Sequence, residues 1–171
     1  MKVLVVVDMQ NDFIDGALGT KEAVAIVENV KNKIAEYKAN SDRIIFTRDT
    51  HQENYLDTSE GKKLPVVHCI EGTNGWQIAD GLDDENCLHI DKPNFGWLGW
   101  SDVDMQDVEE IELIGLCTDI CVVSNALVLK AAYPEIPLKV DARCCAGVTP
   151  ATHKAALETM KMCQVDVYGE E

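Results

Sequence analysis

Four reactive side chains follow short apolar segments of this 171-residue chain and could form one hydrolytic site. Asp8 ends the segment KVLVVVD, Asp49 ends RIIFTRD and Lys92 ends CLHIDK. Cys121 lies just after the segment EIELIGL, in the stretch GLCTDICVVSNA. If the apolar segments are neighbouring parallel strands, these residues gather at the carboxyl edge of one sheet, where α/β folds bind ligands.

Cys121 has the setting of a nucleophile. It falls at or near the start of a predicted helix, where the helix dipole and free N–H groups lower a thiol pKa, and a nearby Lys92 would lower it further. Asp8 could accept the thiol proton and return it to a leaving amine. The backbone N–H groups of Cys117 and Cys121 could face a developing oxyanion. Spacing alone leaves open that Cys121 is a buried core cysteine and that the charged residues face water.

Asp49, His51 and His68 could bind a metal ion. One carboxylate and two imidazoles suit zinc, iron or manganese, with coordination positions left open for water or substrate. Residues 49 and 51 of a strand point to the same face, so both side chains can reach one ion. A polar loop with incidental histidines is the alternative interpretation.

The elements that must position these residues alternate between strands and helices. Strands are predicted at residues 2–8, 43–49, 87–92, 110–116, 138–143 and 164–169. Helices are predicted over residues 20–40, 121–132 and 149–162. The core strands lack clean polar alternation, which favours a sheet covered on both faces. We therefore expect a three-layer, Rossmann-like α/β sandwich with a mostly parallel, six-stranded central sheet.

One stretch does not follow this alternation. Residues 50–86 are polar, glycine-rich and weakly periodic, and a connection of that length is usually functional. The whole chain has the size of one ordinary domain, so residues 1–171 are predicted to form a single domain.

Composition excludes several classes of partner. A formal net charge of -15 argues against a nucleic-acid-binding surface and against anionic membranes. No apolar segment approaches the roughly 20 residues that span a bilayer, and the N-terminus lacks the features of a secretory signal. The seven cysteines show no paired CxxC zinc motif, so we interpret most of them as reduced core residues of a cytoplasmic protein.

Three motifs together resemble those of a known family. DMQNDF after the first strand, the lysine that ends the third and GLCTDICV after the fourth resemble signatures of the isochorismatase-like cysteine hydrolases, and most of all those of nicotinamidases and pyrazinamidases. The resemblance runs from Val3 to about Met162 in the family's order. It implies an isochorismatase-like fold and a catalytic triad of Asp8, Lys92 and Cys121.

The same resemblance implies details around the nucleophile. It places the oxyanion hole at Cys117 and Cys121 and a cis peptide bond between Leu116 and Cys117. Members that cleave isochorismate lack the nucleophilic cysteine, so the presence of Cys121 indicates an amidase.

The resemblance also implies a divalent metal ion as cofactor. Its ligands would be Asp49, His51, His68 and a fourth residue between them, for which Glu60 is the candidate. Zinc is the expected ion, with iron or manganese as alternatives. In the family, the ion contacts the pyridine nitrogen of the substrate.

Aromatic residues are candidates for the substrate pocket. Phe13 matches a phenylalanine that lines the nicotinamide pocket of the family, and Phe95 and Trp97 follow Lys92 closely enough to wall a flat ring. A hydrophobic loop or a subunit contact is the alternative. Pro65 replaces an aromatic residue often found before the metal-binding histidine, and PNFGW replaces the usual Tyr-Ser-type pattern, so the substrate walls depart from the family's.

These observations predict an amidohydrolase that converts nicotinamide to nicotinate and ammonia through a cysteine thioester. A metal-independent amidase for carbamoyl or ureido compounds and a non-catalytic binding protein on the same fold are the alternatives. The expected partners are a small-molecule amide and, because family members are commonly dimers or tetramers, further copies of the chain.

Overall fold

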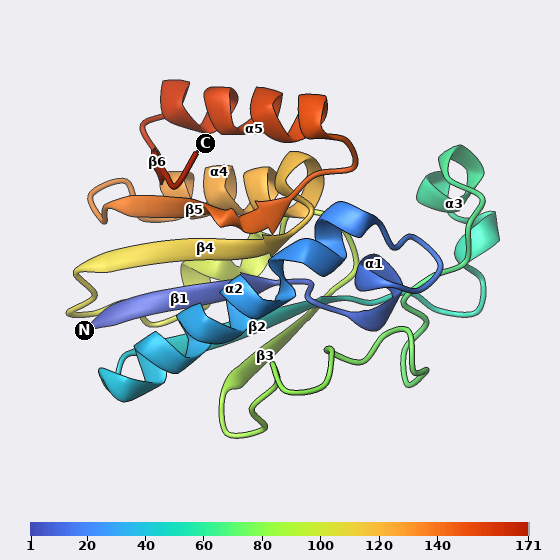
Figure 1. Ribbon diagram of the computed structural model, residues 1–171, viewed down its shortest axis with the longest axis horizontal. Coiled ribbons are helices and arrows are strands. Elements are labelled where there is room, and N and C mark those ends of the chain that lie inside the picture. Colours follow the sequence, from blue (N-terminus) through green and yellow to red (C-terminus); the bar gives the residue numbers. More distant parts are fainter. Residues whose placement is uncertain (171) are drawn as a thin grey trace.

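Six parallel strands form the central sheet of the computed structural model, which describes residues 1–170 (Figure 1). Their spatial order is β3-β2-β1-β4-β5-β6, and every neighbouring pair is parallel. The strands are β1 (Lys2–Val7), β2 (Arg43–Asp49), β3 (Leu88–Lys92), β4 (Glu110–Leu116), β5 (Leu138–Ala146) and β6 (Asp166–Tyr168). The predicted six-stranded α/β sandwich is thus confirmed. Glu171, part of the predicted domain, lies outside the described residues.

Three longer helices cover the sheet. They are α2 (Lys21–Ala39), α4 (Val123–Ala132) and α5 (Pro150–Met162). The shorter helical elements are α1 (Asn11–Ile14), η1 (Tyr55–Asp57), α3 (Ser59–Lys63), η2 (Leu98–Asp102) and the π-helical turn η3 (Thr118–Val122). Threonines begin α2 and α5, because the side chains of Thr20 and Thr149 accept hydrogen bonds from the first-turn N–H groups of Ala23 and Thr152.

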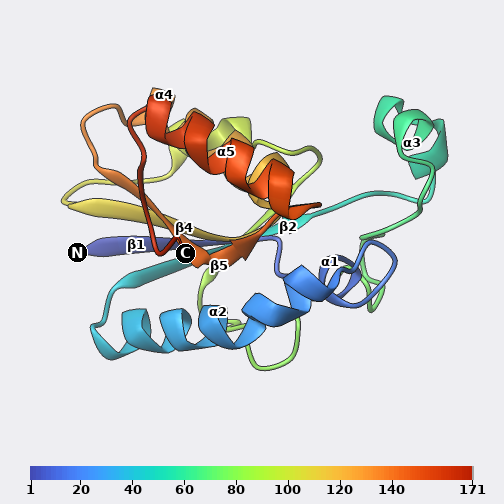
Figure 2. The same ribbon diagram turned by 45° about the horizontal axis from the view of Figure 1, so that its top comes forward.

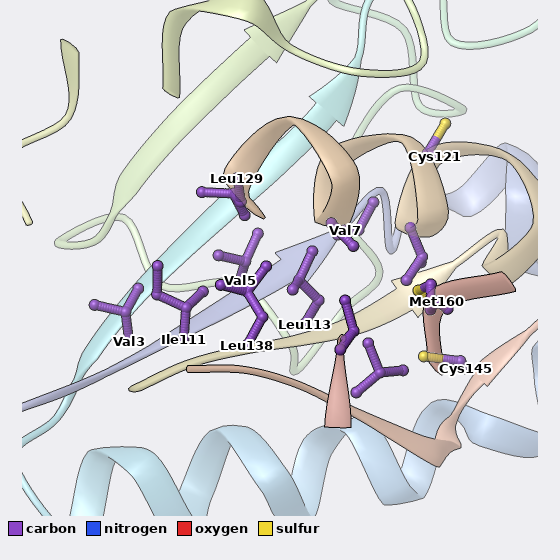
Figure 3. Close-up of a cluster of buried hydrophobic side chains, with 14 of the residues drawn as sticks. Val3, Val5, Val7, Ile111, Leu113, Cys121, Leu129, Leu138, Cys145 and Met160 are labelled. Atoms are coloured by element: carbon purple, nitrogen blue, oxygen red, sulfur yellow. The ribbon is translucent and has the colours of Figure 1, made fainter. Parts of the chain in front are cut away.

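Each face of the sheet carries its own core. Helix α2 covers one face, and α4 and α5 cover the other (Figure 2). On the α2 face, Ile26, Val30 and Ile34 pack with side chains of β1 and β2. On the opposite face, valines of β1 pack with leucines from α4 and β5 (Figure 3). Apolar residues fill both faces because the strands are buried on both sides.

The carboxyl ends of the strands lie together at one end of the molecule. Helices α1 and α3 lie at this end, away from the N-terminus (Figures 1 and 2). Strand β1 stops because Asp8 adopts a left-handed conformation, with φ of 46°. Gly115 is required at the end of β4, since its φ is 116° and a Cβ there would lie 2.1 Å from the Val7 carbonyl oxygen. This packing aligns the ends of β1 and β4.

Within residues 1–170, none of the helices has both the length and the apolar character needed to cross a membrane.

Candidate active site

Lys92 is the centre of a buried charged set at the carboxyl ends of the strands. Its ammonium Nζ lies 2.6 Å from Asp8 Oδ2 and 3.4 Å from the sulfur of Cys121. Asp8 and Lys92 have no solvent exposure, and Cys121 is 4% exposed. Asp8 follows β1, Lys92 ends β3 and Cys121 lies in η3 after β4. The fold therefore brings together the three residues that the sequence nominated as a triad.

Thr47 of β2 holds the carboxylate of Asp8. Its hydroxyl donates to Asp8 Oδ1 at 2.7 Å, and the Asp8 N–H donates to the Thr47 carbonyl oxygen at 3.1 Å. Lys92 occupies the other carboxylate oxygen, so Asp8 is oriented from two sides. Thr47 was not among the residues predicted from the sequence. A pattern that could have identified Thr47 is the alternation of side chains along β2, which puts Thr47 on the same face as Asp49.

Burial and charge act in opposite directions on this set. Burial, helped by the negative charge of Asp49, raises the pKa of Asp8 even though the Lys92 ammonium lowers it. Burial lowers the pKa of Lys92, but the negative charges of Asp8 and Asp49 outweigh it and raise the pKa above its usual range. Lys92 therefore stays protonated, while Asp8 is a stronger proton acceptor than an exposed carboxylate.

The pKa of Cys121 shifts opposite to the direction expected from a helix start. Burial raises the thiol pKa well above its ordinary value, and the charge of Asp8 raises it further, against the lowering effect of Lys92. Desolvation outweighs the helix end because the side chain is nearly inaccessible. The cysteine is thus a thiol before substrate binds, and it needs a base to become a nucleophile. Its sulfur points away from the labelled core side chains (Figure 3).

The turn before Cys121 presents backbone donors. A cis peptide bond joins Leu116 to Cys117, as the family resemblance implied. The Val122 N–H donates to the Cys117 carbonyl oxygen at 3.0 Å and closes the π-helical turn. Within residues 1–170, the Cys117 N–H has no hydrogen-bond acceptor, so it is free to bind an oxyanion. Turns of this π type are frequent at functional sites.

Four possible metal ligands meet beside the charged set. One ligand atom from each of Asp49, His51, Glu60 and His68 lies within 4.8 Å of the others. The Nε2 atoms of His51 and His68 are 2.8 Å and 3.4 Å from Asp49 Oδ2, and Glu60 Oε2 is 3.7 Å from His51 Nε2. Burial alone raises the pKa of Asp49, but hydrogen bonds from both histidines outweigh it and hold the pKa below its usual range.

The chemistry of these four residues fits a divalent metal ion. Asp49 Oδ1 is buried and accepts no hydrogen bond from residues 1–170, and its nearest ammonium, that of Lys92, is 3.9 Å away. A buried carboxylate oxygen without a donor is costly, and a cation would satisfy it. Two imidazoles and two carboxylates are ligands that zinc, iron and manganese accept.

A cavity of about 220 Å³ opens beside Cys121 and the possible metal ligands. Phe13 and Phe95 line it, as do Asp49, Glu60, His68 and both cysteines of the turn. Trp97 does not line it. The Trp97 ring packs edge-on against the Trp100 ring, and the Trp97 backbone N–H donates to Asn125 Oδ1. Trp97 therefore packs against the core.

Aliphatic side chains that were not predicted from the sequence form further walls of the cavity. They are Leu18, Leu64, Ile120 and Val148. These residues come from four separate segments, and no periodic pattern connects them in the sequence. The cavity is thus a mainly apolar chamber whose lining includes the Cys121 thiol and three of the four possible metal ligands.

Comparison with known proteins assigns the family. A family model described as the isochorismatase domain matches residues 2–170. This chain belongs to the isochorismatase family. The family membership inferred from the three sequence motifs is thus confirmed.

Relatives of this isochorismatase-family enzyme include amidases. The nicotinamidase/pyrazinamidase of Mycobacterium tuberculosis is 26% identical, and the match covers 98% of each chain. A crystal structure of pyrazinamidase/nicotinamidase from Streptococcus mutans is 27% identical, with a TM-score of 0.83 over 98% of this chain and 100% of that one. A pyrazinamidase of Pyrococcus horikoshii in complex with zinc is 24% identical, with a TM-score of 0.83 over 99% of both chains.

Proposed function

We propose that this enzyme hydrolyses nicotinamide to nicotinate and ammonia through a thioester on Cys121. The enzyme is an amidohydrolase, in line with its nicotinamidase relatives. One observation carries the proposal: Cys121, held beside Lys92 and Asp8, lines the same cavity as three of the four possible metal ligands. A thiol and a metal ion in the lining of one mainly apolar chamber would suit a flat ring that carries both an amide and a nitrogen lone pair.

The first half-reaction makes the thioester. Asp8 accepts the proton of the Cys121 thiol as the sulfur attacks the amide carbonyl carbon. The oxyanion that forms is faced by the N–H groups of Cys117 and Cys121. Lys92 stays protonated and stabilises both the thiolate and the carboxylate. Asp8 then gives its proton to the amide nitrogen, the C–N bond breaks and ammonia leaves.

The second half-reaction frees the acid. Asp8, again a carboxylate, takes a proton from a water molecule whose oxygen attacks the thioester carbonyl carbon. The C–S bond breaks, nicotinate forms and the proton returns to the Cys121 sulfur. The same two N–H groups face the second oxyanion, so one set of residues serves both steps.

Asp49, His51, Glu60 and His68 would hold a divalent ion, with zinc as our first choice because zinc is bound by the similar pyrazinamidase of Pyrococcus horikoshii. When bound, the ion would act as a Lewis acid toward the pyridine nitrogen of the substrate, which would orient the ring. Phe13 and Phe95 would then flank the ring faces.

Ammonia release from nicotinamide by the zinc-loaded protein tests the proposal. We expect turnover with nicotinamide, none with carbamoyl or ureido compounds, and a covalent acyl-enzyme mass on Cys121 when the reaction is quenched early. Turnover of a carbamoyl compound by the metal-free protein, with none of nicotinamide, would establish the alternative amidase instead. Absence of turnover with every amide would favour a binding protein.

Three further sequence predictions stay predictions. These are a single domain over residues 1–171, a cytoplasmic location and a homo-oligomeric state. All seven cysteines are free thiols, which supports a reducing compartment for the protein. Size-exclusion chromatography with light scattering would measure the oligomeric state.

A further inference from the structure

The side chain of Gln10 completes the sheet beside Asp49. Strand β1 pairs with β2 only as far as Val7 opposite Thr47, because Asp8 turns the chain away. The backbone of Asp49 therefore has no strand partner on that side. Gln10 takes the place of one: the Asp49 N–H donates to Gln10 Oε1 at 2.7 Å, and Gln10 Nε2 donates to the Asp49 carbonyl oxygen at 2.8 Å.

Gln10 also holds the loop that follows His68. Its second N–H donates to the carbonyl oxygen of Trp76 at 2.9 Å. Both amide hydrogens and the amide oxygen are thus in use, and the residue is fully buried. One side chain consequently fixes the Asp49 backbone relative to the loop from residue 69 to 77.

Asp12 holds the same loop at the residue next to His68. Its Oδ2 accepts the N–H of Cys69 at 2.8 Å, and Cys69 has a left-handed φ of 47°. The Asp12 N–H donates to the Gly75 carbonyl oxygen at 3.0 Å. Gly75 packs so closely that an added Cβ would lie 2.1 Å from Asp12 Oδ2. The loop therefore closes around this carboxylate.

We propose that Gln10 and Asp12 are positioning residues that place Asp49 and His68 for one metal ion. Because both lie just after Asp8, the segment that carries the catalytic base also fixes two of the metal ligands. The inference rests on the metal site of the proposed function. Neither residue touches the cavity, so each acts through the ligand that it orients.

The test measures metal affinity directly. The zinc dissociation constants of Gln10→Met and Asp12→Ala would be determined by competition with a chromophoric chelator, beside the visible spectrum of the cobalt(II)-loaded proteins. We expect affinity to fall about 10- to 100-fold, as is common when residues that orient metal ligands are removed. The cobalt spectrum should also shift, because the ligand geometry changes.

Two further variants separate positioning from general damage. Asn11→Ala is the matched control, since Asn11 lies in the same segment and its side-chain amide donates at 2.8 Å to the carbonyl oxygen of Asn74, which is not next to a ligand in the sequence. Its zinc affinity should equal that of the wild type. Asp12→Asn keeps an acceptor for the Cys69 N–H and should restore most of the affinity lost in Asp12→Ala.

The outcomes distinguish the two proposals. If the wild type binds no zinc, the metal site of the proposed function is wrong, and this inference falls with it. If the wild type binds zinc and both Gln10→Met and Asp12→Ala bind it equally well, only the positioning roles are wrong. Should Gln10→Met fail to fold, the comparison of Asp12→Ala with Asp12→Asn decides, because Asp12 is only partly buried.

Discussion

Lys92 is a charged side chain with no solvent exposure, and negatively charged neighbours stabilise its buried ammonium group. A buried ammonium without a partner costs several kcal/mol, so Lys92 depends on Asp8 at 2.6 Å for its charge. The residue types at the strand ends made Asp8, Lys92 and Cys121 candidates, and the family resemblance was needed to interpret them as a triad. The raised thiol pKa was not predictable, because it follows from nearly complete burial, which no local pattern reveals.

The pH dependence of kcat/KM should report the carboxyl group of Asp8. Burial raises its pKa, and a protonated Asp8 cannot accept the thiol proton, so activity is lost as the pH falls through that raised pKa. We expect the acid limb to have its midpoint above about 4, the ordinary value for an aspartate. Asp8→Asn should lower kcat by about 10²- to 10⁴-fold and abolish this limb. A midpoint below the ordinary value would contradict the assignment.

Two cysteines of the same turn should respond oppositely to substitution. Cys117→Ala should leave kcat within about two-fold, because only the Cys117 backbone N–H is used, whereas Cys121→Ala should abolish turnover. Initial rates of ammonia release measure both. A large loss in Cys117→Ala, with its thermal stability unchanged, would show that the Cys117 side chain itself takes part.

At the scale of elements, the first turn of the helix after β4 and the loop after Lys92 are tied by one residue. Asn125 of α4 is fully buried and donates to the carbonyl oxygens of Phe95 and Cys121 at 2.9 Å and 2.8 Å. Its Oδ1 accepts the Trp97 backbone N–H and the Trp100 indole N–H. This residue therefore fixes Phe95, a cavity wall, relative to the nucleophile.

Removing this link should cost both stability and activity. Asn125→Ala leaves buried polar groups unpaired, so the free energy of unfolding should fall by about 1–3 kcal/mol. KM should rise because Phe95 is no longer held. Urea denaturation and initial rates are the measurements, and the exposed Asn86→Ala is the control. Unchanged stability in Asn125→Ala would contradict the bonding role.

The strands and long helices could be predicted from the sequence, with ends that differ by a few residues. The third strand begins at Leu88 instead of residue 87, and β5 runs on to Ala146. The region of residues 50–86 carries His51, Glu60 and His68, three of the four possible metal ligands, and its functional role stays a prediction. Its elements η1 and α3 were not predicted, because helices of three and five residues are too short for a periodic pattern.

At the scale of the whole molecule, a polar network lies away from the cavity. Lys33 of α2 pairs with Glu112 at 3.4 Å and with Asp141 at 3.2 Å. Arg143 adds a contact of 2.9 Å to Asp141, which is 1% exposed. The network joins α2 to β4 and β5. The strand order behind these contacts could not be predicted from the sequence, because apolar segments of similar composition do not specify their neighbours.

This network should make the stability depend on pH. Burial raises the pKa of Asp141, but hydrogen bonds from Arg143 and Lys33 outweigh it and lower the pKa below its usual value. The stabilisation is therefore present above the unfolded pKa of about 3.9 and lost as the pH falls through the lower folded pKa. Asp141→Asn should lower the free energy of unfolding at pH 7 by about 1–3 kcal/mol.

Urea denaturation across pH measures the effect. The difference between wild type and Asp141→Asn should shrink toward pH 3, while the exposed Asp80→Asn should match the wild type throughout. A difference that is the same at every pH would show that packing, and not charge, is lost.

The proposed catalytic and metal-binding side chains lie at or after the ends of β1, β2, β3 and β4, from residue 8 to residue 121. No contiguous fragment shorter than that span contains the complete set. Contacts between such distant segments form slowly, because long loops must close first. During refolding, turnover should therefore return later than the circular-dichroism signal of the helices. Turnover would thus report that the whole chain has folded.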